Sequence, residues 1–355
     1  MSEKGETRRL GYALVGAGAI AGVQAEALSQ VPGARLVAVY NRTAGRARAL
    51  GERWQIPWTT EYDSLLARPE VDVVSICTAS GARVELARKA AQAGKHVVCE
   101  KPLEVTLERA DEIIQACEEA GVHLGVIFEY RFFPATLAVK NAVDAQRLGR
   151  LVLATAHVPW YRTDAYYASG AWRATWALDG GGALMNQSIH WIDLLLWMGG
   201  DVSKAHGFIT RRAHPQIEVE DVGVAILQFQ SGALGTIQGT TGAYPGFPAR
   251  IELYGDRGTI VLQERQIVAW KLADGTPEEE ARMLRIGRDV TATGASDPLG
   301  IGAEGHRLQF TEITAAILAG HPPSIDGDEG RKALALILAI YRSNTITDIM
   351  PLRDA

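Results

Sequence analysis

Two short stretches of the chain combine residue types that can move protons. In Glu100-Lys101-Pro102, the proline beside the lysine restricts the direction of the chain and helps to hold the ammonium in place. Farther along, Asn186 and His190 stand four residues apart, on one face of a predicted helix. An imidazole and a fixed ammonium are suited to removing a proton from a hydroxyl and stabilising the alkoxide that develops. We therefore treat Lys101 and His190 as the candidate catalytic pair.

The roles within this pair follow from ordinary pKa values. Histidine titrates near ~6.5, whereas a lysine near ~10.4 must be strongly depressed before it can act as a base. We predict that His190 is the general base and that Lys101 orients the hydroxyl. The opposite assignment stays open, because the sequence does not fix either distance to the substrate. Asn186 would hold a neighbouring substrate hydroxyl, and Asp193 would brace the helix.

A glycine-rich turn near the N-terminus fits the pattern G-x-G-x-x-G/A. It follows an apolar strand and opens a helix, which is the context of a dinucleotide site rather than of a purely structural turn. Gly16 permits the tight turn, Gly18 lets the backbone approach a pyrophosphate, and Ala21 keeps helix and strand close together. The sequence therefore predicts a dinucleotide site that includes Gly16, Gly18, Ala19, Ile20 and Ala21.

The end of the second predicted strand bears on the choice of cofactor. A site that prefers NAD usually has Asp or Glu there, but this chain has Asn41 followed by Arg42. A guanidinium suits a 2′-phosphate, so NAD(P) is expected with NADP mildly favoured, although Arg42 as a solvated turn residue is the alternative. Thr78, Glu100 and Lys101 follow later strands and complete the predicted cofactor site.

The first ~130 residues alternate continuous apolar strands with helices. Such strands imply a parallel sheet covered on both faces, a doubly wound α/β fold. The expected strands are 9–15, 35–40, 71–78, 95–99 and 122–128, and the expected helices are 19–30, 44–54, 61–67, 82–93 and 106–120.

After residue 130 the pattern changes to strands joined by hairpin-like turns, which indicates an antiparallel sheet. The stretch from Asp274 to Gly300 is expected to be a surface excursion. The expected strands are 151–158, 204–210, 222–230, 233–239, 249–254, 259–262 and 267–270, and the expected helices are 134–146, 183–197, 305–319 and 329–344.

Composition limits the function. The 355 residues contain 36 Lys and Arg against 41 Asp and Glu, and this net charge of -5 argues against a nucleic-acid binder. The longest apolar run, Ala333–Tyr341, is far shorter than the ~20 residues of a membrane span. The N-terminal residues lack the apolar region of a secretory signal, so we expect a cytoplasmic protein. Neither the three cysteines nor the other residues show metal-ligand spacing, so no metal is expected.

Aromatic and basic residues crowd the segment before Gly180. They could stack on a sugar ring or clamp an anionic group, or they could equally serve domain packing. Our candidates for substrate contact are Tyr161, Arg162 and Trp172, to which we add Arg131.

The chain resembles the glucose–fructose oxidoreductase / inositol dehydrogenase (Gfo/Idh/MocA) family of NAD(P)-dependent sugar dehydrogenases. The resemblance covers most of the chain and rests on Gly16–Ala21, Glu100-Lys101-Pro102, Tyr130-Arg131-Phe132-Phe133-Pro134 and Gly180–Asp193. It implies an N-terminal Rossmann domain (1–130) and a C-terminal α/β domain (131–355) with an open, mainly antiparallel sheet. The helix at 329–344 would pack back on the first domain. The family's catalytic lysine and histidine correspond to Lys101 and His190.

The resemblance also bears on substrate and assembly. Many members have an aspartate where this chain has Asn186, and the Asn-Gln-x-x-His form is similar to the branch that oxidises nucleotide-linked amino sugars or related glycosides at carbon 3. The aspartate-based proton relay of the inositol enzymes is therefore not carried over. Members commonly pair two sheets face to face, which implies a homo-oligomer, a dimer or tetramer.

The expected function is hydride transfer between a nicotinamide and a secondary hydroxyl or ketone of a sugar, sugar derivative or cyclitol. Two alternatives remain. One is a glycosidase or hydro-lyase that uses bound NAD for transient oxidation, a class that this family also includes. The other is a non-catalytic dinucleotide-binding regulatory protein, which would tolerate the loss of Lys101 and His190; both residues are present.

Overall fold

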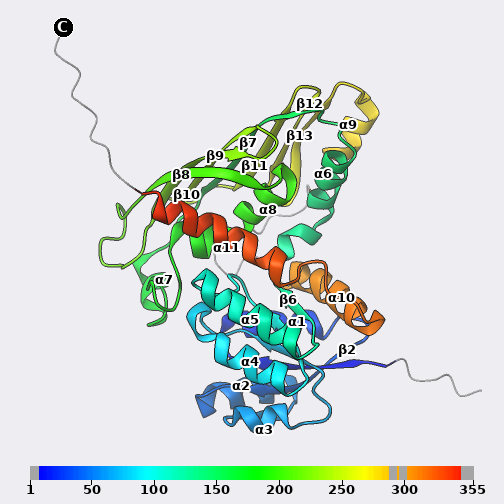
Figure 1. The fold of residues 1–355 in the computed structure, drawn as a ribbon, viewed down its shortest axis with the longest axis vertical. Coiled ribbons are helices and arrows are strands. Elements are labelled where there is room, and N and C mark those ends of the chain that lie inside the picture. The colour runs from blue at the N-terminus through cyan, green and yellow to red at the C-terminus, as the bar shows by residue number, and fades with distance from the viewer. Residues whose placement is uncertain (1–7, 288–293, 296–301, 345–355) are drawn as a thin grey trace, which may run out of the picture.

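Two β-sheets with helices packed against them make up the protein (Figure 1). The structure is a computed structural model that describes residues 8–287, 294–295 and 302–344. The parallel sheet, sheet A, belongs to the N-terminal half of the chain, and the mixed sheet, sheet B, belongs to the C-terminal half. The doubly wound first domain and the mainly antiparallel second sheet predicted from the sequence are both confirmed.

Sheet A has six parallel strands in the order β3-β2-β1-β4-β5-β6. Strand β1 (Leu10–Val15), in the interior of the sheet, is buried along its whole length, and this explains its continuous apolar sequence. The two-residue strand β3 is too short to have been recognised from the sequence. The strands are β1 (Leu10–Val15), β2 (Ala34–Tyr40), β3 (Trp58–Thr59), β4 (Val73–Ile76), β5 (His96–Cys99) and β6 (Leu124–Val126).

The helices between these strands lie close to their predicted positions. The predicted helix at 82–93 begins instead with a short 3₁₀ turn, Ser80–Ala82. The helices are α1 (Ala19–Leu28), α2 (Ala44–Trp54), α3 (Tyr62–Leu66), α4 (Val84–Gln92) and α5 (Leu107–Glu119).

Sheet B has seven strands in the order β13-β12-β11-β7-β10-β9-β8. The first of them in the chain, β7, lies in the middle, parallel to β10 and antiparallel to β11, and the remaining pairs are antiparallel. The strands are β7 (Leu151–Pro159), β8 (Val202–Thr210), β9 (Val222–Phe229), β10 (Leu234–Thr240), β11 (Arg250–Gly255), β12 (Gly258–Gln263) and β13 (Gln266–Leu272).

Among the described residues of the C-terminal half there are six further α-helices. In the predicted excursion 274–300, the first part forms a helix, and residues 288–293 and 296–300 lie outside the described residues. The helices are α6 (Pro134–Asp144), α7 (Asp164–Ala168), α8 (Ile189–Gly199), α9 (Pro277–Met283), α10 (Glu304–Ala319) and α11 (Gly327–Arg342).

The last two helices tie the two halves together. Helix α10 packs against α1 of sheet A, where Phe310 meets Tyr12 edge-on and Thr314 shares a hydrogen bond of 2.8 Å with the Tyr12 hydroxyl. Helix α10 comes after residue 130 in the chain and still packs against α1, because a helical pattern does not say which sheet the helix covers. Helix α11 contacts α5 and β6 on one side and α8 and β8 on the other (Figure 1).

The outer face of sheet B is open and carries several large apolar side chains among polar ones. Helices α8 and α11 cover the inner face, while the alternating side chains of β8, β9 and β10 leave large apolar groups exposed on the outer face. These outer-face residues are Phe208, Val224, Ile226 and Leu234. A contiguous exposed apolar surface usually marks an interaction site.

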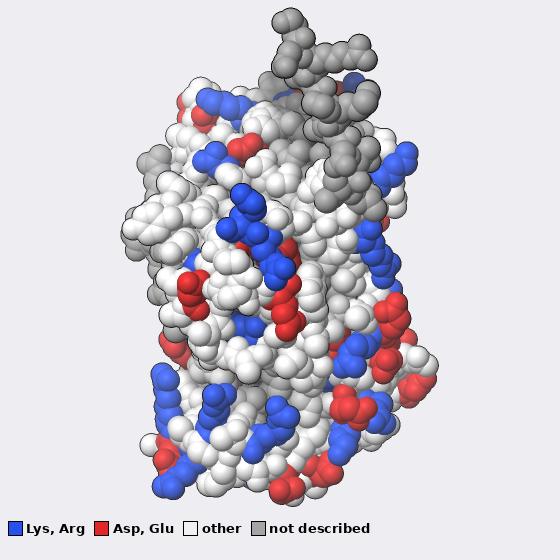
Figure 2. All heavy atoms as spheres, turned by 90° about the vertical axis from the view of Figure 1, so that its left-hand side faces the viewer, with Lys and Arg blue, Asp and Glu red and all other residues white. Residues whose placement is uncertain are grey.

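The charged residues form no comparable surface on the side of the molecule drawn in Figure 2, where positive and negative side chains are interspersed. Within the described residues, no helix is both long enough and apolar enough to span a bilayer.

Candidate functional site

The glycine-rich turn lies at the carboxyl end of β1 and opens α1. Gly16 has a φ of +106°, and a Cβ there would lie 3.0 Å from the Cys77 carbonyl carbon, so both backbone shape and space require glycine. Gly18 is exposed, and a Cβ built on it meets no described atom within 4 Å. Ala19 and Ile20 form the open start of the helix, while Ala21 is fully buried against the strand. The turn thus presents free backbone N–H groups and room for a phosphate.

Asn41, at the end of β2, braces this turn. Its Oδ1 accepts a hydrogen bond of 3.3 Å from the Ala17 N–H, and its Nδ2 donates to the Thr43 carbonyl. The next residue, Arg42, is exposed. The adenosine side of the candidate cofactor site therefore offers a neutral amide and a guanidinium rather than a carboxylate.

Glu100, at the end of β5, lies at the centre of a buried polar network. Its Oε1 accepts hydrogen bonds from Gln24 of α1 at 2.7 Å and from His306 of α10 at 3.1 Å, and its Oε2 accepts from the Lys101 N–H. Burial opposes ionisation of Glu100, but His306 and Lys101 outweigh it and hold its pKa below the usual range. A largely buried carboxylate held in this way positions the Lys101 backbone rather than facing the open turn.

Arg83 also fixes the lysine loop, and the sequence analysis missed it. Its buried guanidinium donates to the carbonyl oxygens of Thr78, Glu100, Lys101 and Pro102. The Lys101-Pro102 peptide bond is cis. No sequence signal marked Arg83, because the carbonyls it binds come from two loops after β4 and β5.

The Lys101 ammonium reaches across to the second half of the chain. Its Nζ donates a hydrogen bond of 2.7 Å to the main-chain oxygen of Asn186. The Asn186 side chain donates to Asp179 and its Oδ1 accepts from Gln187 at 3.0 Å. Burial lowers the pKa of Lys101, although the Glu100, Glu129 and Asp179 carboxylates oppose this shift. The structure therefore brings Lys101 and Asn186 together across the gap between the sheets.

The segment that carries Asn186 departs from the predicted helix 183–197. Residues Ala183–Ser188 form a turn of π-helix, and the α-helix begins only at Ile189. The Glu220 carboxylate accepts hydrogen bonds from the N–H groups of Gly182 and Leu184, and a Cβ at Gly182 would meet the Glu220 carbonyl. Glu220 lies in the loop before β9, and its contacts fix the start of the π-helical turn. Single π-helical turns are frequent at functional sites.

His190 is buried in a cage of aromatic rings. Tyr130 stacks on its ring with centroids 5.1 Å apart, and Phe128 meets it edge-on at 5.8 Å. Burial and the nearby charge of Lys101 hold the pKa of His190 well below its usual range. The imidazole is therefore neutral at neutral pH, as a general base must be before it accepts a proton.

Two buried groups beside His190 carried no sequence motif. Glu129 lies with Oε2 3.5 Å from His190 Nδ1. His306, which binds Glu100, has a raised pKa because the carboxylates of Glu129 and Glu100 outweigh the effect of burial. No pattern in the sequence marks either residue. Both come close to His190 only because η2 (Glu129–Phe132) and α10 pack together.

The predicted substrate contacts fall into two groups. Tyr161 and Trp172 are partly exposed, Tyr161 against Tyr244 and Trp172 under the Arg173 guanidinium. Arg162 is buried, and its guanidinium donates to Gln187 and to the carbonyls of residues 161, 294 and 295. Its role in the structure is to order this segment.

Arg131, the fourth candidate for substrate contact, is buried and forms two ion pairs. Its guanidinium forms two hydrogen bonds with Asp193, at 2.8 and 2.6 Å, and a third of 2.9 Å with Glu329 of α11. Arg131 thus joins α8 to α11 through Asp193 and Glu329.

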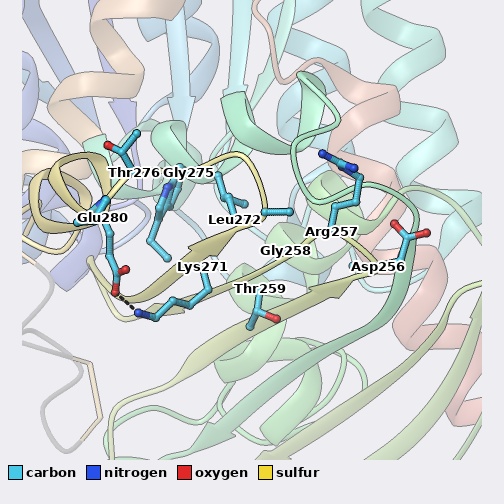
Figure 3. A pocket seen from close by; sticks show the side chains of 13 residues that line it. Asp256, Arg257, Gly258, Thr259, Lys271, Leu272, Gly275, Thr276 and Glu280 are labelled. Carbon is cyan, nitrogen blue, oxygen red and sulfur yellow. Dashed lines mark ion pairs between the residues drawn. The ribbon is translucent and has the colours of Figure 1, made fainter.

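A hollow of about 500 Å³ lies at the far end of sheet B, between the β11–β12 turn and the start of α9 (Figure 3). Lys271 forms an ion pair with Glu280 on its wall. It contains none of the residues discussed above. Within the described ranges, no group of three or more His, Cys, Asp or Glu residues is placed to hold a metal ion.

Comparison with known proteins agrees with this geometry. Residues 10–128 match the model of an oxidoreductase family with an NAD-binding Rossmann fold, and residues 136–261 match the GFO/IDH/MocA C-terminal domain. The chain is 28% identical to inositol 2-dehydrogenase of Rhizobium meliloti, over 94% of this chain and 96% of that protein.

Solved structures extend the comparison. The WlbA dehydrogenase of Bordetella pertussis, in complex with NADH and UDP-GlcNAcA, is 32% identical, covers 95% of this chain and 97% of its own, and superposes with a TM-score of 0.83. The WlbA dehydrogenase of Chromobacterium violaceum, with the same two ligands, is 30% identical, covers 95% and 94%, and has a TM-score of 0.83.

Proposed function

This chain belongs to the GFO/IDH/MocA family of oxidoreductases, whose N-terminal domain binds NAD, and we propose that its substrate is a nucleotide-linked or otherwise derivatised sugar oxidised at a secondary hydroxyl. The observation that carries the proposal is the hydrogen bond from Lys101 Nζ to the Asn186 main chain, one turn before His190. It joins the end of β5, next to the nucleotide turn, to the helix of the second sheet. A hydroxyl-bearing carbon bound there would lie between the nicotinamide and an acid–base pair.

His190 acts as the general base in this proposal. Its neutral, buried imidazole accepts the hydroxyl proton while the hydride leaves for the nicotinamide. Lys101 donates a hydrogen bond to the hydroxyl oxygen and stabilises the developing alkoxide. The bound nicotinamide supplies the hydride acceptor. Asn186, held by Asp179, contacts a neighbouring substrate hydroxyl, and Tyr161 and Trp172 lie against the sugar or its substituent.

The substrate class rests on the side chain at position 186 and on the relatives. The WlbA structures contain UDP-GlcNAcA and are at least 30% identical to this chain, whereas the inositol 2-dehydrogenase is 28% identical. Asn186 begins the sequence Asn-Gln-x-x-His, where many family members have an aspartate in place of the asparagine. The form with asparagine is similar to that of the branch acting on nucleotide-linked amino sugars. A cyclitol is the second candidate substrate, because the match to the inositol 2-dehydrogenase extends over almost the full length of both chains.

The test is a panel of substrates with NAD and NADP, read as net formation of reduced cofactor. UDP-sugars, free pyranoses and inositols form the three arms, and oxidation of a UDP-sugar is the expected result. Lys101→Ala and His190→Ala should each lower turnover by ~10²–10⁴-fold with cofactor affinity retained. Undiminished turnover in His190→Ala refutes the assigned base, and substrate conversion without net reduced cofactor indicates transient oxidation instead.

We also propose that the cofactor site favours NADP modestly over NAD. The Asn41 side chain accepts a hydrogen bond from the glycine-rich turn, and the next residue, Arg42, is exposed. In this proposal Arg42 lies beside the ribose 2′ position. A guanidinium binds a phosphate with charge-assisted hydrogen bonds.

We propose, finally, that two copies of the chain pair through the outer face of sheet B. Phe208, Val224, Ile226 and Leu234 are each between 45% and 63% exposed there, a large apolar surface for a soluble enzyme to leave in water. Burying such a face against its copy is worth about 25 cal/mol per Å².

A further inference from the structure

A buried carboxylate lies beside the candidate base, and its Oε2 atom has no hydrogen bond among the described residues. Glu129 Oε2 is 3.5 Å from His190 Nδ1, and the two residues are 3% and 7% exposed. Neither atom has a hydrogen-bond partner among the described residues. A buried polar atom left without a partner costs about 1–3 kcal/mol. Two such atoms that face each other call for a function.

We propose that Glu129 is the final proton acceptor of a relay that passes through His190. The hydroxyl proton of the substrate moves to His190 Nε2, the Nδ1 proton moves to Glu129 Oε2, and the C–H hydride leaves for the nicotinamide. The alcohol becomes a ketone, the carboxylate becomes a carboxylic acid, and the imidazole is neutral before and after. The inference rests on the proposed function and adds a residue to it.

The charges around the pair explain why the proton moves on to Glu129. An imidazolium at His190 would be buried near the Lys101 ammonium, and the pKa of His190 lies well below its usual range. Burial and the nearby Glu100 carboxylate raise the pKa of Glu129, although His306 and Lys101 oppose this. Transfer to Glu129 therefore removes a buried negative charge instead of creating a buried positive one.

The packing holds both groups in place for such a transfer. The stacked Tyr130 ring holds the plane of the imidazole and Nδ1 lies toward Glu129, so the relay assigns the other nitrogen, Nε2, to the substrate hydroxyl. Helix α10 packs closely against the Glu129 side chain, because a Cβ at Gly305 would lie 2.7 Å from Glu129 Cγ. The 3.5 Å separation has to shorten to ~2.8 Å, as catalytic hydrogen bonds commonly do when substrate binds.

The tautomer of His190 tests the relay without any substrate. In ¹⁵N-histidine-labelled protein with bound NAD, and with the signal assigned by His190→Gln, the proton should sit on Nδ1 at high pH. As the pH falls through the Glu129 titration, it should move to Nε2, because the protonated carboxyl then donates to Nδ1. Lys101, Glu100 and His306 also face this pair. Glu129→Gln should abolish the change, and a pH-independent tautomer in the unmutated protein overturns the proposal.

Kinetics supply the second arm once a substrate is known. Glu129→Gln should lower kcat by about 10²-fold with NADH affinity retained. When kcat is plotted against the fraction of D₂O in the solvent, the unmutated enzyme should give a curve, because two protons move in one step. The Glu129→Gln variant should give a straight line, because only one proton moves. Glu264→Gln is the matched control, because Glu264 is another buried glutamate and its Oε1 accepts a hydrogen bond from the Ala249 N–H at the edge of β11. Equal kcat in the two variants overturns the relay. Failure to find any oxidised sugar would count against the proposed function alone, since the tautomer needs no substrate.

Discussion

Replacing Asp193 by asparagine should weaken the fold and leave substrate binding alone. Asp193 is 1% exposed and Arg131 is 5% exposed, and two hydrogen bonds join them. Asparagine keeps the shape of the side chain but removes its charge and one of its two acceptors. The substitution therefore leaves the Arg131 guanidinium buried with less compensation.

The magnitude follows from what remains around Arg131. Breaking a buried ion pair from one side costs about 3–5 kcal/mol. Glu329 still accepts from Nη1 at 2.9 Å, and the Trp197 ring centroid lies 5.1 Å from Cζ, so we expect the lower end of this range. At ~2–4 °C per kcal/mol, a loss of about 3 kcal/mol should lower the Tm by roughly 6–12 °C.

Thermal unfolding and steady-state kinetics on the same preparations provide the check. Asp111→Asn is the control, because its ion pair with Arg331 is on the surface and is worth at most ~1 kcal/mol. If Asp193→Asn instead unfolds at the unmutated Tm and raises KM, then Arg131 contacts the substrate and the structural role assigned to it is wrong.

Three further predictions concern cofactor, assembly and pH. Calorimetric titration should give a lower Kd for NADPH than for NADH, and Arg42→Ala should narrow the gap by roughly 1.5–3 kcal/mol; equal affinities in the unmutated protein contradict this. Light scattering should find an oligomer at micromolar concentration, and Ile226→Asp on the outer face of sheet B should shift it toward monomer, whereas a monomeric unmutated protein rules the interface out. Burial raises the pKa of both Glu220 and Glu264 to about 7. The folded protein thus keeps protons that the unfolded chain releases above pH ~4.3, so stability should fall between pH 5 and 8 by about 3 kcal/mol per group, and Glu264→Gln should flatten that fall in urea unfolding.

Local signals in the sequence predicted five of the six strands of sheet A and the glycine-rich turn. The strand–turn–helix at Gly16–Ala21 is specified by neighbouring residues, because a positive φ at Gly16 and the start of α1 depend on short-range geometry. Hairpins such as β9–β10 and β11–β12 were recognisable for the same reason. Insertion of β7 in the middle of sheet B was not, since the pairing of distant strands leaves no local pattern.

The candidate site divides along the same line. Residue types and motif spacing selected Lys101, Asn186 and His190, whose chemistry is visible in the sequence. His306 could not be selected in this way. It reaches Glu100 because α10 packs against α1, and the sequence does not say which surface the apolar side of α10 covers.

Tertiary structure alone decided how the charged groups are shared. The sequence suggested Arg131 and Arg162 as candidate substrate contacts, and in the fold one is paired with Asp193 and the other is held by Gln187 and backbone carbonyls. Glu129 carried no motif and lies beside His190. A buried charge must find a partner wherever the folded chain provides one, and such partners here are tens to hundreds of residues away. Sequence therefore determined which chemistry this protein carries, and packing determined which of its ionisable groups remain available to perform it.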